Sequence, residues 1–330
     1  MTRLRALPIV AGLAGICVAL AALAHAQTPS TTVQAWPQRP VKFVIPFGPG
    51  AGADIGARLL QERLSTRWGK PVVIDNRPGG DSIIAIQAVL SAEDDHTFLW
   101  SPSGSFIVHP FQYQKLPYNP DDILPIASFS STILSLAVPA TMNINTLADF
   151  VQRARAEPGK FNAAAVPGIT ELAFDYLAKT EGLNFTKVPY RDIVQAVNDL
   201  AEGRLQVYSS SYAIQRPQRE AARIKVLAQM GSKRAPGLPD IPTAAEAGFP
   251  ALEMEGLVGL FGSKAVSPAL REKIGADIVA AADDKDIDAK LTATAQTPTR
   301  GGAKEFTDTI ARQRAHIAAI AKALGLQPTR

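Results

Sequence analysis

The sequence is poor in the residues that catalysis and metal binding use most often. It contains one cysteine, Cys17, and four histidines among 330 residues. Cys17 lies in an N-terminal apolar segment that we expect to be removed, which would leave no disulfide and no thiol. No G-x-S-x-G motif and no H-x-x-x-H spacing occurs, so neither a serine–histidine nucleophile nor a zinc site is indicated. We therefore expect no catalysis, no metal and no cofactor.

Charge and long apolar runs are also scarce. The formal net charge is +4, and loss of the two arginines of the N-terminal segment would lower it to 4 − 2 = +2. Lysine and arginine form no cluster, so nucleic acid is not an expected partner. After the N-terminus no apolar run reaches about 18 residues, the length that a membrane-spanning helix needs.

The N-terminus itself has the pattern of an export signal. Arg3 and Arg5 precede an apolar run from Ala6 to Leu23, and Ala24-His25-Ala26 fits a small-x-small cleavage site. A single membrane anchor is the alternative, but the polar, proline-rich segment that follows favours cleavage. We predict a signal peptide over residues 1–26 and a periplasmic mature protein.

Short apolar runs alternate with helical patterns along the rest of the chain. Strands are predicted near residues 41–47, 72–77 and 96–100 with helices between them, an order that implies parallel strands. A second, smaller α/β set begins near residue 145, where Thr146-x-x-Asp149 resembles a capping box. The run from Ser128 to Pro139 predicts a strand that crosses between the two sets. We predict two α/β lobes, lobe 1 from residues 27–135 and 232–330 and lobe 2 from residues 136–231.

The stretch from Gly48 to Asp54 is the strongest candidate binding element. It joins a strand to a helical pattern, so its backbone N–H groups and the helix N-terminus are suited to an anion. The glycine spacing does not match a dinucleotide fingerprint and no G-K-[ST] occurs, so we favour a carboxylate over a nucleotide. Asp54 has two interpretations, a first-turn acid that fixes the loop or a ligand contact.

Five motifs in order resemble the Bug (TctC-type) family of periplasmic solute-binding receptors, which serve tripartite tricarboxylate transporters. They are VIPFGPGAGADIGARLL, GKPVVIDNRPGG, LPYNPDDILPIA, VPY and GSKRAPGLPDIPTAAEAGFP. The resemblance implies a two-lobed Venus-flytrap fold of the type II-like periplasmic-binding-protein class. It also implies that a small carboxylate binds between the lobes and passes to the permease subunits of a membrane transporter. A receptor that docks on a sensor kinase is the alternative, and we expect a monomer.

The resemblance, together with serines at strand ends, gives a set of expected ligand-binding residues. The departures from the family pattern put Asp81, Glu171 and Asp192 near the site, with Arg191 to offset part of their charge. Like charges crowd a shared site, so we predict a zwitterion, a monocarboxylate or an aromatic acid in place of a tricarboxylate. The full set is Phe47, Gly48, Pro49, Gly50, Ala51, Gly52, Asp54, Gly80, Asp81, Ser82, Ser101, Ser103, Pro167, Gly168, Ile169, Thr170, Glu171, Arg191, Asp192, Tyr208 and Ser209.

Overall fold

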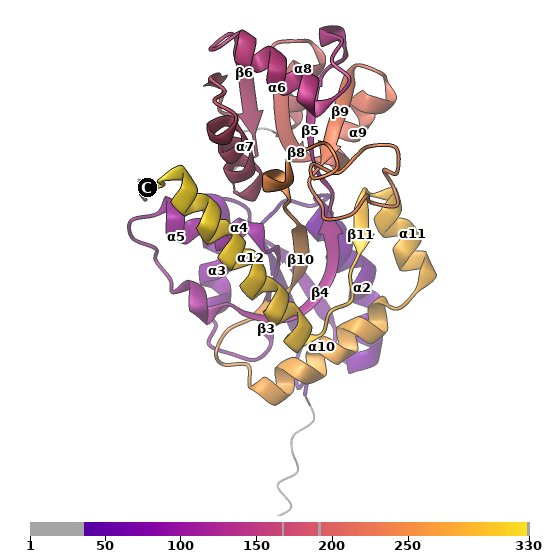
Figure 1. The fold of residues 1–330 in the computed structure, drawn as a ribbon. Coiled ribbons are helices and arrows are strands. Elements are labelled where there is room, and N and C mark those ends of the chain that lie inside the picture. Colours follow the sequence, from indigo (N-terminus) through magenta and orange to yellow (C-terminus); the bar gives the residue numbers. More distant parts are fainter. Residues whose placement is uncertain (1–35, 167, 191–192, 329–330) are drawn as a thin grey trace, which may run out of the picture. The chain divides into compact units, whose positions relative to one another are not determined.

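The first of two β-sheets begins with parallel strands (Figure 1). β1 (Val41–Ile45) pairs in parallel with β2 (Val72–Asn76) and with β3 (Thr97–Pro102). α2 (Gly52–Trp68) and α3 (Ile83–Leu90) connect them, so the predicted βαβαβ order is confirmed. β10 (Gly256–Gly262), β4 (Leu124–Thr132) and β11 (Gln296–Pro298) add antiparallel strands. The sheet is therefore mixed, with the order β11-β4-β10-β3-β1-β2.

The second sheet is built from the middle of the chain. Its strand order is β7-β6-β8-β5-β9. β6 pairs in parallel with β7 and β8, whereas β5 is antiparallel to β8 and β9. The strands are β5 (Leu134–Pro139), β6 (Phe161–Ala165), β7 (Phe185–Lys187), β8 (Val207–Ser211) and β9 (Ile224–Gln229).

The chain passes between the sheets where the sequence predicted a crossing strand. β4 ends at Thr132 in the first sheet and β5 begins at Leu134 in the second, with only Ile133 between them. The structure, a computed structural model, describes residues 36–166, 168–190 and 193–328, so the predicted signal peptide lies outside the described residues. Residues 39–330 form one compact unit, and the lobe boundaries stay a prediction.

The helices surround the two sheets (Figure 1). Thr146 Oγ1 accepts the Asp149 N–H at 3.0 Å, which confirms the predicted cap of α6. Within the described residues, each helix is too short or too polar to cross a membrane. The remaining helices are α4 (Gly104–Ile107), α5 (His109–Gln112), α6 (Leu147–Ala156), α7 (Ile169–Thr180), α8 (Ile193–Ala201), α9 (Tyr212–Glu220), α10 (Pro268–Ala282), α11 (Lys285–Ala293) and α12 (Ala303–Leu324), with 3₁₀ turns η1 (Gly80–Ser82), η2 (Pro120–Asp122), η3 (Ala140–Met142) and η4 (Pro250–Leu252).

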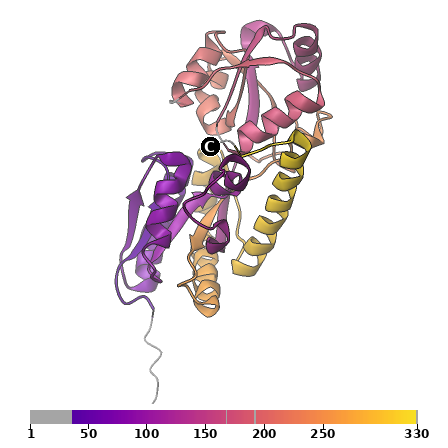
Figure 2. The same cartoon turned by 90° about the vertical axis from the view of Figure 1, so that its left-hand side faces the viewer.

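Buried aromatic side chains and one long helix tie these elements together. Phe43 and Trp100 are fully buried and stack at a ring-centroid distance of 5.5 Å under α2. Stacking of this kind adds about 0.5–1.5 kcal/mol to the burial of apolar area. α12, the long yellow helix of Figures 1 and 2, packs on β4 of the first sheet and on α7 beside the second. Its C-terminal half therefore links the two lobes.

Candidate functional site

The glycine-rich loop after β1 leads directly into α2, as predicted. Gly50 has φ +87°, a left-handed conformation that glycine adopts without a steric penalty. The helix begins at Gly52, and the first bond within it runs from the Ile55 N–H to the Ala51 carbonyl. The N–H groups of Gly52 and Ala53 therefore have no carbonyl partner within the helix. Two donors and the positive end of the helix dipole meet at this point.

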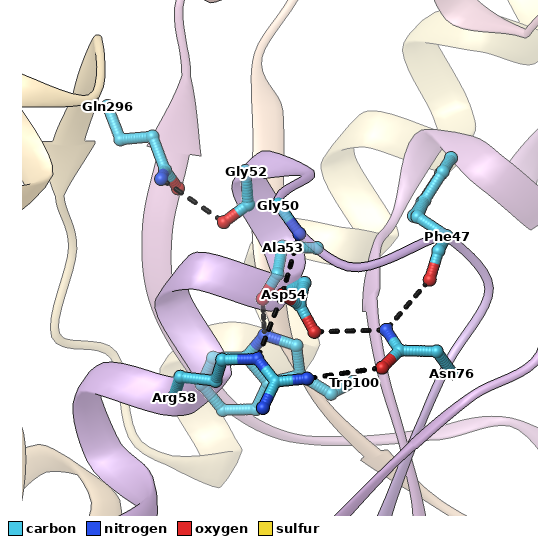
Figure 3. A network of polar contacts seen from close by, with 9 residues as sticks. All are labelled: Phe47, Gly50, Gly52, Ala53, Asp54, Arg58, Asn76, Trp100 and Gln296. Carbon is cyan, nitrogen blue, oxygen red and sulfur yellow. Dashed lines mark hydrogen bonds and ion pairs between the residues drawn. The ribbon is translucent and has the colours of Figure 1, made fainter.

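Asp54 fixes the shape of this loop from beneath (Figure 3). It is 1% exposed and accepts hydrogen bonds from the Gly50 N–H at 2.9 Å, Arg58 Nε at 3.0 Å and Asn76 Nδ2 at 3.0 Å. Burial raises the pKa of Asp54, but these three donors outweigh it and hold the pKa below its ordinary value. Of the two interpretations of Asp54, the structure supports that of a first-turn acid that fixes the loop.

Two further side chains hold the first turn of α2 (Figure 3). Trp100 Nε1 donates to the Ala53 carbonyl at 2.9 Å, and Gln296 Nε2 donates to the Gly52 carbonyl at 3.2 Å. Gln296 is in turn positioned by Ser130 Oγ, which donates to its Oε1 at 2.8 Å. Because both bonds use carbonyls, they leave the N–H groups of the turn available to a ligand.

A cavity of about 780 Å³ opens next to this turn. It is bounded by the Gly loop and α2, by the η1–α3 turn and α4–α5, by the start of α7 and by α9. Apolar side chains predominate, and among the described residues the lining groups that can carry charge are Asp81, His109 and Arg216. Small-molecule sites in proteins have this size and this mixture of an apolar lining with a few polar groups.

A second helix N-terminus also lines the cavity. Gly168, at φ +107°, precedes α7, and Ile169 and Thr170 form its first turn. The first bond within α7 runs from the Leu172 N–H to the Gly168 carbonyl, so the N–H groups of Ile169 and Thr170 have no partner within the helix. Two helices, one from each lobe, therefore begin at the same cavity.

Asp81 is held in an unusual backbone conformation at the cavity wall. Asp81 and Ser82 have φ +49° and +72°. Tyr113 donates its hydroxyl hydrogen to Asp81 Oδ2 at 2.6 Å. Asp81 thus lines the cavity from the η1 turn, and a residue that follows α5 fixes its carboxylate.

About half of the residues predicted from the sequence line this cavity. They are Phe47, Gly48, Gly50, Ala51, Gly52, Asp81, Ser82, Gly168, Ile169 and Thr170. Pro167, Arg191 and Asp192 lie outside the described residues.

The other predicted residues do not line the cavity, for identifiable reasons. Asp54, Ser101, Ser103, Tyr208 and Ser209 are at most 1% exposed. Ser103 Oγ donates to Gln313 Oε1 at 2.6 Å, and Ser209 Oγ donates to the Thr170 carbonyl at 3.3 Å. Pro49 and Gly80 are exposed neighbours of lining residues, and Glu171 is paired with Lys187 at 3.9 Å. The serines at strand ends thus bond to protein groups.

Several lining residues were not predicted. A helix pattern does not show which of its side chains reaches a distant cavity, so Arg216 of α9 gave no signal. Thr294 and Gln296 come from the C-terminal segment, far from the glycine loop in sequence. The other polar lining residues outside the predicted set are Ser105, His109, Gln112, Thr132 and Ser211.

The described residues hold no cluster of three or more metal-ligating side chains. Two mixed α/β sheets with a cavity between their helix N-termini define a periplasmic-binding-protein fold, the class of solute-binding receptors. The model of the tripartite tricarboxylate transporter family receptor (TctC) matches residues 56–326. The chain belongs to this family, which is a family of binding proteins and not of enzymes.

Individual relatives agree with this assignment. A UPF0065 protein from the tcbD-tcbE intergenic region of a Pseudomonas species is 34% identical over 295 residues, 87% of each chain. The solved structure of R. palustris Rpa4515 with adipate is 27% identical, with a TM-score of 0.79, and covers 89% of this chain and 100% of that one. The periplasmic binding protein BugD, at 23% identity and a TM-score of 0.75 over 89% of this chain and 100% of its own, shares the fold.

Proposed function

We propose that this protein is exported through a cleaved signal peptide of residues 1–26 and captures a small carboxylate in the periplasm. Lobe 1, residues 27–135 and 232–330, and lobe 2, residues 136–231, would close on the ligand. The loaded monomer would then deliver it to the permease subunits of a tripartite tricarboxylate transporter.

One observation carries the proposal: the N-terminal turns of α2 and α7 both line the cavity with N–H groups that lack partners within their helices. Each helix N-terminus favours a nearby negative charge by about 0.3–1 kcal/mol, and each free N–H is a further donor. A carboxylate at either turn would be bound without any side-chain base. The adipate in the structure of Rpa4515 supports the same ligand class.

The lining also indicates what lies between the charged ends of the ligand. Phe47, Ile55, Val108, Ile169 and Ile214 contribute apolar surface to the cavity. Of the acids that depart from the family pattern, Asp81 lines the cavity, Glu171 does not, and Asp192 lies outside the described residues. We therefore propose a mono- or dicarboxylate with an apolar body, such as an aliphatic diacid or an aromatic acid.

The test is a thermal-shift screen of protein purified from the periplasm of an expressing bacterium. The panel comprises adipate, hexanoate, benzoate, citrate and glutamate. A ligand at 100 times its Kd stabilises the native state by about 2.7 kcal/mol, which is a rise of several degrees in Tm for a chain of this size. Mass spectrometry of the denatured protein identifies any ligand that was retained, and the intact mass tests cleavage after Ala26.

The proposal fails if no carboxylate shifts Tm and no acid is released on denaturation. Delivery is tested separately, by uptake of the labelled ligand in cells with and without the permease subunits.

A further inference from the structure

Arg216 is the one permanently positive side chain that lines the cavity among the described residues. It belongs to α9, a helix of the second lobe, and its side chain is 38% exposed. Nothing in the glycine-loop pattern points to it, and the backbone donors of α2 and α7 do not require it. The presence of this cation in the same cavity as two helix N-termini suited to anions therefore requires a separate explanation.

Two partners hold the Arg216 guanidinium in place. Nε donates to Glu220 Oε1 at 2.8 Å, one turn further along α9. Nη1 donates to the carbonyl oxygen of Ala293, the last residue of α11. A guanidinium has five N–H donors, and these two bonds leave the Nη2 group without a hydrogen-bond partner in the described part of the chain. The group is therefore oriented before a ligand arrives and still has donors to offer.

A short segment of the cavity lining connects this guanidinium to the first turn of α2. Ala293 is followed by Thr294, and Gln296 Nε2 donates both to Thr294 Oγ1 at 3.3 Å and to the Gly52 carbonyl at 3.2 Å. Residues 293–296 therefore run from the Arg216 guanidinium to the first turn of α2, and all four line the cavity. Arg216 and the first turn of α2, which belong to different lobes, are therefore linked through one short segment of the cavity lining.

We infer that Arg216 is a ligand-binding residue that pairs with the carboxylate held by the first turn of α2. This inference rests on the proposed function and identifies which group of the second lobe takes part. A carboxylate placed between the two would contact both lobes at once. Because only contacts made better in the closed form can drive closure, this shared carboxylate would favour closure. The planar fork of arginine suits a carboxylate better than a lysine ammonium does.

The experiment compares Arg216→Gln, Arg216→Lys and Arg223→Gln by isothermal titration with adipate, hexanoate and benzoate. Arg223 is a matched control, because it follows α9 and does not line the cavity, and its guanidinium donates a hydrogen bond to Gln218. We expect Arg216→Gln to weaken binding of the carboxylate probes by about 10- to 100-fold, the usual range for a charge-assisted hydrogen bond. Arg216→Lys should recover part of this loss, and Arg223→Gln should leave Kd within about twofold.

The salt dependence of Kd separates ligand binding from a structural role. If Arg216 pairs with the ligand, raising the ionic strength weakens wild-type binding more than it weakens binding to Arg216→Gln. A purely structural Arg216 would change Tm and Kd without changing this salt slope.

The outcomes for the two proposals differ. If the wild-type protein binds a carboxylate probe and Arg216→Gln binds it as Arg223→Gln does, the role of Arg216 is refuted and the proposed function stands. If the wild-type protein binds none of the three probes, both are refuted for this ligand class. Should Arg216→Gln not fold, Arg216→Lys tests the planar fork of arginine instead: carboxylate binding weaker than in Arg223→Gln supports the role of Arg216, and equal binding refutes it.

Discussion

Removing the Asp54 carboxylate should damage both the stability of the protein and its glycine loop. Asp54 accepts three hydrogen bonds while only 1% exposed. Hydrogen bonds to a charged group contribute about 1.5–3 kcal/mol each. The Arg58 side chain is 48% exposed and Gly50 is also exposed, so water can replace much of the stabilisation that these two hydrogen bonds contribute. We therefore expect Asp54→Ala to lower the free energy of unfolding by about 2–4 kcal/mol.

Urea denaturation followed by tryptophan fluorescence measures this loss, since buried Trp100 reports on the same region. Asp308→Ala is the matched control, because Asp308 also forms an i,i+4 ion pair, with Lys304 at 2.9 Å, but on the surface. That pair should be worth less than about 1 kcal/mol. If Asp54→Ala costs no more than Asp308→Ala, the carboxylate does not support the loop and the reasoning fails.

The pH dependence of stability has a definite sign at Asp54. Its pKa in the folded protein is lowered, so its contribution is present above the unfolded pKa of about 3.9 and is lost as pH falls through the folded pKa. Unfolding free energies of the wild type and of Asp54→Asn should therefore converge below about pH 4. A constant difference from pH 7 down to pH 2 would contradict this origin of the stability.

Three further changes test other parts of the site and the fold. A Cβ at Gly104 would lie 2.8 Å from Ile169 Cδ1, which belongs to the other lobe. Gly104→Ala should therefore weaken adipate binding by about tenfold. The control Gly302→Ala, where a Cβ meets nothing within 4 Å, should leave adipate binding unchanged. Asp81→Asn keeps an acceptor for Tyr113 but removes a negative charge from the cavity, so adipate should bind about 2- to 10-fold more tightly by calorimetry; weaker binding would show that the charge itself helps to hold the ligand. Burial raises the pKa of Asp277, but hydrogen bonds from donors on α2 and α10 outweigh burial and hold that pKa below its ordinary value. Asp277→Asn should therefore reduce the free energy of unfolding by about 1–3 kcal/mol at pH 7 and hardly at all at pH 2. Equal losses at both pH values in urea titrations would count against this.

The local elements of this protein could be predicted from its sequence because their signals are local. The apolar run 41–47 followed by Gly48 to Asp54 predicted a strand, a loop and a helix start, and the structure has all three. The Thr146–Asp149 cap is likewise formed by residues three positions apart. The motifs that indicated the family also lie within short segments, and the match of the family model to residues 56–326 confirms the family. Short-range hydrogen bonds and steric limits determine such features wherever they occur.

The composition of the cavity was decided by the tertiary structure. Ser103 follows β3, as predicted, whereas Ser209 lies within β8; hydrogen bonds to Gln313 and to the Thr170 carbonyl, respectively, hold the two serines in the core. Arg216 and Gln296 are far from the glycine loop in sequence, yet both line the same cavity. Whether a polar side chain faces a ligand or another protein group depends on partners brought together by packing. Strand order β11-β4-β10-β3-β1-β2 and the crossing at Ile133 create those neighbours, and neither is encoded in any one segment.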